Sequence, residues 1–128
     1  MYSLTVQRFL NLMRLLDVMS AEPAFQVRYL EWRNFPDPLA ALGELFEDLQ
    51  GYEGLIEDMK ESGDLRDEEE AIFRRILSLA DVIDEDPRSY TRAEVNNGET
   101  WREVRDAAMV LKLSLASLVQ RNPEFFAG

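Results

Sequence analysis

The chain has 128 residues, 46% of them hydrophobic and 30% charged, and its 14 Lys and Arg against 25 Asp and Glu give a formal net charge of −11. This length and composition predict a single folded domain over residues 1–128 and exclude an intrinsically disordered chain. The chain contains no histidine and no cysteine, which excludes disulfides, thiol nucleophiles, imidazole bases and Cys/His metal sites.

The negative charge is concentrated in one stretch of the sequence. Residues 1–36 carry three acidic and four basic residues, a net charge of +1, and residues 71–128 carry nine acidic and eight basic residues, a net charge of −1. Residues 37–70 carry thirteen acidic residues against Lys60 and Arg66, a net charge of −11. Such a field repels nucleic-acid phosphates and anionic membranes and attracts a basic surface. We therefore expect neither nucleic acid nor membrane as a partner.

The first residues do not resemble a targeting segment. Gln7, Arg8, Asn11 and Arg14 interrupt the apolar positions, so the unbroken apolar core of a signal peptide is missing. No other run reaches the roughly 18 apolar residues of a membrane span. We expect a cytoplasmic location.

Two helices are predicted in the first 36 residues. Apolar residues recur every three or four positions over residues 4–19 and cover most of the helix circumference, so this helix should lie at the centre of the fold. Ser20 and Pro23 mark a break and a new start. Phe25, Tyr29 and Trp32 then follow at helical spacing. The alternative here is a short strand, but its alternation fails after Tyr29.

The aromatic stripe of Phe25, Tyr29 and Trp32 has two interpretations. Aromatic residues at helical spacing most often pack into a core, and this is the favoured prediction. The alternative is a surface for self-association, which would give a homodimer through these three side chains.

An acidic helical region is predicted after residue 37. Asp37 is expected to cap a helix whose first position is Pro38. Apolar side chains then fall on one side of the helical wheel and carboxylates on the other. Gly51 and Gly54 either lie within one helix, at a cost of up to about 1 kcal/mol each, or divide it in two.

The second half of the chain is predicted to contain two long helices and a short one. The first stops at residues 86–87, the short one stops at the turn of residues 96–98, and the last spans about residues 101–120. Phe125 and Phe126 are expected to dock back on the bundle. The sum is an all-α, single-domain bundle of about five helices plus one short helix. The predicted capping boxes are Asp67 with Glu70, Thr91 with Glu94 and Thr100 with Glu103.

Asp and Glu are the strong metal ligands left in this chain, and they select hard cations such as Mg²⁺. The spacing of Glu44 and Glu47, followed by Glu61 and Asp64, resembles that of the all-α nucleotide pyrophosphohydrolases of the MazG type. The resemblance implies an enzyme in which both pairs lie inside facing helices and hold Mg²⁺ and a nucleotide phosphate. The second pair spans a helix stop at residues 62–63, and the first falls on the solvent side of the wheel. A solvated acidic face is therefore the favoured interpretation.

The other motifs that could indicate a catalytic, metal or phosphate site are incomplete in this sequence. The acids of residues 81–86 lack the ligand pattern of an EF-hand and are expected to pair with nearby arginines. Ser114 and Ser117 lie near Lys112 but on a helix, whereas a catalytic serine needs an activated, exposed position. No Gly-rich phosphate loop occurs. We expect no catalytic residue, no metal site and no cofactor.

The favoured function is a non-enzymatic acidic binding protein that docks the face of about residues 44–70 onto a basic protein partner. By size and charge, the closest functional class is the immunity or inhibitor proteins of bacterial toxins. The alternatives are an Mg²⁺-dependent pyrophosphohydrolase-like enzyme, a homo-oligomeric structural or assembly protein, and an acidic face that only confers solubility. The candidate partner-binding residues are Glu44, Glu47, Asp48, Glu57, Asp58, Glu61, Asp67 and Glu68.

Overall fold

The computed structural model of the chain describes residues 2–127. Within this range every regular element is helical and no strand occurs, so the all-α prediction is confirmed. Short 3-10 turns lie at Ala40–Leu42, Pro87–Tyr90 and Pro123–Phe126. The helices are α1 (Leu4–Met19), α2 (Pro23–Trp32), α3 (Gly43–Gln50), α4 (Glu53–Glu61), α5 (Asp67–Asp84), α6 (Arg92–Asn97), α7 (Glu99–Ala116) and α8 (Leu118–Arg121).

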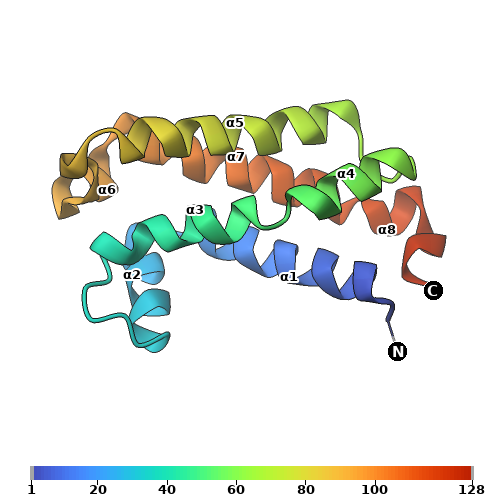
Figure 1. Cartoon of the computed structure of the whole chain (residues 1–128), viewed down its shortest axis with the longest axis horizontal. Helices are drawn as coiled ribbons and strands as arrows, with labels where there is room; N and C mark the ends of the chain where they lie inside the picture. The colour runs from blue at the N-terminus through green and yellow to red at the C-terminus, as the bar shows by residue number, and fades with distance from the viewer. Residues whose placement is uncertain (1, 128) are drawn as a thin grey trace.

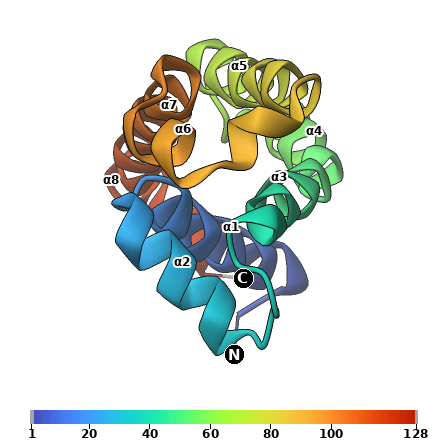
Figure 2. The same cartoon turned by 90° about the vertical axis from the view of Figure 1, so that its left-hand side faces the viewer.

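Four rods run along the long axis of the molecule (Figure 1). They are α1, the consecutive pair α3 and α4, α5, and α7, and successive rods run in opposite directions. The view along this axis shows the four rods around a common centre, with α2 and α6 at one end (Figure 2). Counting α3 with α4 as one rod and α8 as the end of the α7 rod, the described residues form the five long helices and one short helix that the sequence predicts.

Helix α1 has the bounds that the apolar spacing predicts. It is one of the four rods around the common centre and does not itself occupy that centre. The Ser3 hydroxyl caps it by accepting a hydrogen bond of 3.2 Å from the backbone N–H of Val6. Seven of its 16 residues are buried, and it packs against α2, α3, α4 and α7. At its start, Phe9 meets the rings of Phe125 and Phe126 at 5.3 and 5.7 Å between centroids, so the predicted docking of the C-terminal aromatics is confirmed.

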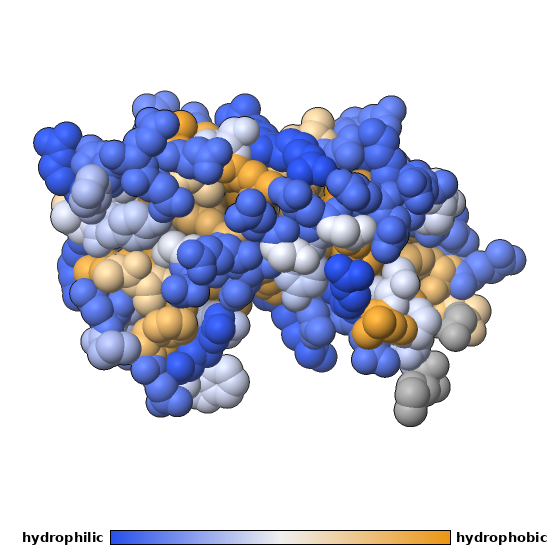
Figure 3. All heavy atoms as spheres, viewed as in Figure 1, coloured by the Kyte–Doolittle hydropathy of each residue, from blue (hydrophilic) through white to orange (hydrophobic). Residues whose placement is uncertain are grey.

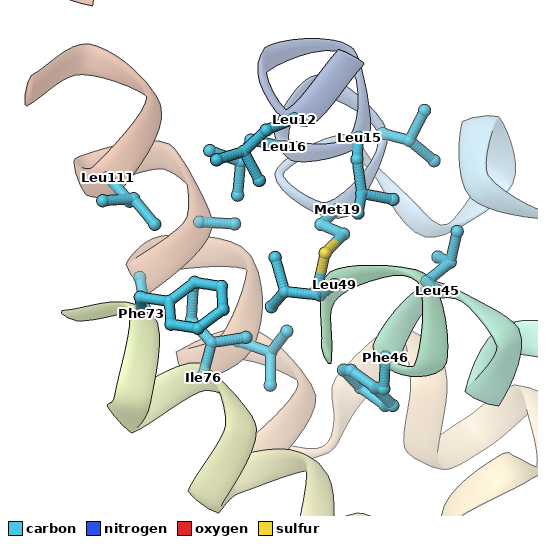
Figure 4. Close-up of a cluster of buried hydrophobic side chains, with 14 of the residues drawn as sticks. Leu12, Leu15, Leu16, Met19, Leu45, Phe46, Leu49, Phe73, Ile76 and Leu111 are labelled. Carbon is cyan, nitrogen blue, oxygen red and sulfur yellow. The ribbon is translucent and has the colours of Figure 1, made fainter. Parts of the chain in front are cut away.

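The core lies where the four rods meet (Figure 4). Leu12 and Leu16 of α1, Leu49 of α3 and Phe73 of α5 are each fully buried there. Burying side chains of this size contributes about 1.5 to 3 kcal/mol each, which makes this contact the main source of stability.

The break between α3 and α4 falls at Gly51 and Tyr52, so the two-helix alternative is the correct one. The start of this region differs from the prediction. The Asp37 carboxylate accepts a hydrogen bond of 3.3 Å from the N–H of Ala40, but no helix begins at Pro38. A single 3-10 turn follows with Leu39 as its N-cap, and α3 begins only at Gly43.

The predicted capping boxes have different outcomes. Thr91 caps α6 as predicted, since its hydroxyl accepts from the Glu94 N–H at 3.4 Å. The box of Thr100 with Glu103 is wrong, because α7 already begins at Glu99 with Gly98 as its N-cap. The box of Asp67 with Glu70 is wrong by one residue, for the N-cap is Arg66 and its N–H donates to Glu69 at 2.8 Å.

The prediction that the aromatic stripe of α2 lies in the core is wrong for Phe25 and Trp32, whereas Tyr29 is half-buried and packs against the core. Phe25 is 52% exposed and Trp32 is 78% exposed. Because α2 lies at the end of the bundle and packs against α1 and the turn before α3, it has one inward face. That face carries Gln26 and Leu30, which are both buried.

Candidate functional site

The eight predicted binding residues lie on three consecutive helices. Three belong to α3, three to α4 and two to the first turn of α5. Glu44 and Asp48 are half-buried, and the other six are exposed. The face formed by α3, α4 and α5 is largely hydrophilic (Figure 3).

The carboxylates of the acidic stretch, residues 37–70, fall into three groups by the contacts that they make. Four of its thirteen carboxylates bind a cation, and Asp37 and Asp64 accept hydrogen bonds from neutral groups. The remaining seven make no ion pair among residues 2–127. These seven, which we call the free carboxylates, are Glu44, Glu47, Glu57, Asp58, Glu61, Asp67 and Glu68. The paired ones are Asp48 with Arg33, Glu53 with Arg74, Glu69 with Arg121 and Glu70 with Lys60.

The free carboxylates therefore include seven of the eight predicted binding residues. Asp48 is the exception, because its carboxylate receives the Arg33 guanidinium at 3.1 Å.

Like charges crowd around Glu47 on α3. The nearby Glu44 carboxylate raises the pKa of Glu47, and Asp48 and Asp84 raise it further. Glu47 also lines a groove of about 200 Å³ between α3 and α5, where Glu53, Asp81 and Asp84 are its acidic neighbours. Neighbouring negative charges disfavour the ionised form of a carboxylate, and a cation that binds beside the carboxylate favours that form again.

Glu69 is an acid of the same stretch with a different place in the fold. Its side chain is fully buried. Its two oxygens accept from the Arg121 guanidinium at 2.9 and 3.0 Å, from the Ser114 hydroxyl at 2.7 Å and from the N–H of Arg66 at 2.8 Å. Arg121 also donates to the backbone oxygen of Asp64 at 2.9 Å. Glu69 thus connects the start of α5 to α7 and α8 through these hydrogen bonds.

Sequence reasoning missed Glu69, although a signal was present. The buried residues of α5 are Glu69, Phe73, Ile76, Ala80 and Ile83, which recur every three or four positions as one helix face does. Glu69 is the first member of this series.

An aromatic groove of about 620 Å³ adjoins the acidic surface. It lies between α1, α2 and α3 and is bordered by Tyr29, Trp32 and Tyr52. We call it the aromatic groove. Glu47 and Asp48 line its α3 side, and Arg14 lines its α1 side. The surface is notched along its lower edge beside α2 (Figure 3).

The carboxylate pairs that resemble the pyrophosphohydrolase spacing lie in different surroundings. Glu44 and Glu47 are one turn apart on α3, whereas Glu61 is the last residue of α4 and Asp64 lies in the loop that follows. Asp64 accepts hydrogen bonds from Ser62 and from Asn122. Across residues 2–127, no three carboxylates come together in a way that could hold a metal ion.

The remaining polar clusters are partly paired. Asp86 pairs with Arg88 at 3.0 Å, so the arginine pairing expected for residues 81–86 is confirmed at one of the four acids. Asp84 instead accepts a hydrogen bond from the Tyr90 hydroxyl. Lys112 pairs with Asp17 of α1 at 3.1 Å. In the described part of the chain, no helix is long and apolar enough to cross a membrane.

Comparisons with protein-family models, with curated proteins and with solved structures find no match to this chain. Its function is therefore inferred from its own surfaces and side chains.

Proposed function

We propose that this chain is a non-enzymatic binding protein whose free carboxylates dock onto a basic protein partner. The supporting observation is that seven carboxylates of α3, α4 and the start of α5 lack an ion pair among the described residues. At Glu47 the crowding is strong enough to raise the pKa. A basic partner would supply the missing cations and relieve this repulsion.

Electrostatic docking suits a protein that must find its target quickly. Complementary charge raises association rates toward about 10⁸ to 10⁹ M⁻¹s⁻¹ and selects against acidic competitors. Immunity and inhibitor proteins of bacterial toxins need this behaviour. The small size and the charge of this chain fit that class by analogy, and the fold itself does not specify it.

The test neutralises free carboxylates while leaving the paired ones in place. We design a variant with Glu47, Glu57, Asp58 and Glu61 changed to Gln or Asn. Asp48 is kept, since its loss would release Arg33. In pull-downs from the native host at low salt, the wild type should recover a basic protein, and moderate salt should reduce the capture steeply. The neutralised variant should fail to recover it.

A matched control removes the same amount of charge elsewhere. Glu22, Glu31, Asp106 and Glu124 are exposed and make no ion pair within residues 2–127. Their neutralisation should leave capture intact, and circular dichroism should show both variants folded. If the first variant still captures the basic protein, or if both variants lose it equally, the proposal is wrong.

A homodimer through α2 is the second candidate, and the exposure of Phe25 and Trp32 favours it. Light scattering on the wild type and on Phe25→Ala tests it. A dimer that the substitution dissociates would support this candidate.

A further inference from the structure

A charged surface alone does not account for a tight complex. Complementary charge contributes mainly to association rate and specificity. Most of the binding free energy comes from a few anchors, enriched in Trp, Tyr and Arg, that fill pockets. The aromatic groove borders the acidic surface and shares Glu47 and Asp48 with it. It is therefore placed to hold such an anchor.

The side chain of Arg33 shows which chemistry the rim of this groove accepts. Its guanidinium carbon lies 5.6 Å from the ring centroid of Tyr29 and 5.4 Å from that of Phe35. The same guanidinium donates to Asp48 at 3.1 Å. A guanidinium here thus lies over aromatic rings and pairs with a carboxylate of α3.

The same two features recur inside the groove at Trp32 and Glu47, and among residues 2–127 no cation lies over the ring of Trp32 or pairs with the carboxylate of Glu47. Trp32 lies beside Tyr29, with 6.3 Å between ring centroids, and the residue is 78% exposed. Glu47 lines the opposite side and is one of the free carboxylates. A tryptophan face is the strongest of the aromatic faces for a cation.

We infer that the aromatic groove receives an arginine side chain of the basic partner, which stacks on Trp32 and pairs with Glu47. This inference rests on the proposed function, because the partner must be basic. Arginine fits better than lysine, since its planar guanidinium can stack on a ring and donate to a carboxylate at once. A second copy of this chain is a poorer occupant, because each copy carries a net charge of −11 and the two repel.

The experiment uses hexa-arginine and hexa-lysine peptides as probes of the full chain, followed by calorimetry and by amide NMR shifts at low salt. Hexa-arginine should bind more tightly than hexa-lysine and should shift the amides of Gly51 and Tyr52 at the groove. Trp32→Ala should weaken hexa-arginine binding about tenfold. Trp32→Phe, which keeps an aromatic face, should recover part of this loss.

Phe25→Ala is the matched control, because Phe25 is an exposed aromatic of the same helix and does not line the groove. It should change hexa-arginine binding less than about twofold. Equal binding of the two peptides would overturn the preference for a guanidinium. A loss as large with Phe25→Ala as with Trp32→Ala would overturn the groove as the site.

A second arm separates this inference from the proposed function. Glu57 and Asp58 lie on α4 and do not line the groove. Neutralising both should weaken peptide binding, while the peptide that still binds should shift the same groove amides, those of Gly51 and Tyr52. Binding that depends on these acids but not on Trp32 overturns the groove and leaves the acidic surface standing. Binding that depends on Trp32 but not on these acids supports the groove and contradicts the acidic surface.

Discussion

Replacing Glu69 with alanine tests whether a buried ion pair holds the C-terminal end of the bundle. The substitution removes both oxygens that accept from Arg121 and the contact with Ser114. Arg121 is then left with its side chain 17% exposed and without a carboxylate. Its remaining acceptors are the Ser114 and Asp64 backbone oxygens and the Ser117 hydroxyl.

The expected loss of unfolding free energy follows from leaving the Arg121 guanidinium largely buried without its carboxylate partner. Removing one partner of a buried pair destabilises a protein by about 3 to 5 kcal/mol. Because Arg121 keeps neutral acceptors and some contact with water, we expect Glu69→Ala to cost about 3 kcal/mol, near the lower end. That is a large fraction of the roughly 5 to 15 kcal/mol by which a domain is stable. The melting temperature should fall by about 10 °C.

Urea unfolding followed by circular dichroism at pH 7 measures this cost. The control is Glu68→Ala, since Glu68 is the preceding residue, is exposed and makes no ion pair in the described part of the chain. The control should stay within about 0.5 kcal/mol of the wild type. Equal effects of the two substitutions would refute the role assigned to the buried pair, and so would a cost for Glu69→Ala below about 1 kcal/mol.

The same contact predicts a pH dependence. Burial alone would raise the pKa of Glu69, but the hydrogen bonds from Arg121, the Arg66 N–H and Ser114 outweigh it and lower the pKa below its usual range. A carboxylate with a lowered pKa in the fold contributes stability above its unfolded pKa of about 4.3 and loses it as the pH falls. The stability difference between wild type and Glu69→Gln should therefore shrink between pH 6 and pH 3.

Three further substitutions test the fold and the site. Phe73→Ala should cost about 4 kcal/mol in urea unfolding, because the ring is fully buried where the four rods meet. Thr91→Ala should cost about 1 kcal/mol by the same measurement, because the hydroxyl caps α6. Glu47→Gln should not lower the melting temperature, because the substitution removes one of several crowded like charges. Added salt should also raise the melting temperature of this variant less than that of the wild type. A clear loss of stability would contradict this expectation.

Local patterns sufficed wherever a helix is fixed by its own residues. The bounds of α1 follow from apolar spacing, and the start of α6 follows from the Thr91 cap. The start of α5 was predicted in this way only to within one residue. Its N-cap is Arg66, a residue type that cap preferences do not favour, and Glu69 is fixed by Arg121, 52 positions away in the sequence. The spacing of the buried residues of α5 could place Glu69 on the inner face of the helix, but no local pattern identifies Arg121 as its partner.

The orientation of α2 was beyond the sequence for a related reason. Periodicity shows that Phe25, Tyr29 and Trp32 share a side of a helix, but not which side faces inward. In the structure, the Gln26 amide donates to the backbone oxygens of Val18 and Met19 at 3.1 Å each. These carbonyls lie in the last turn of α1, where backbone oxygens have no partner within the helix; that of Val18 also accepts from the N–H of Ala21 at 3.1 Å. This contact turns Gln26 inward and leaves Tyr29 and Trp32 on the rim of the aromatic groove, with Phe25 exposed outside it.

Counting charges along the sequence could predict the acidic surface, but not which of its carboxylates are free and which are buried in ion pairs. Glu68 and Glu69 are adjacent and chemically alike, yet one is a free carboxylate and the other is a buried structural residue. Changing Glu69 to Lys would place two cations in one buried site and should unfold the domain. A loss of partner binding in such a variant would say nothing about docking. The free carboxylates are therefore the positions at which charge can be changed to test binding without testing the fold.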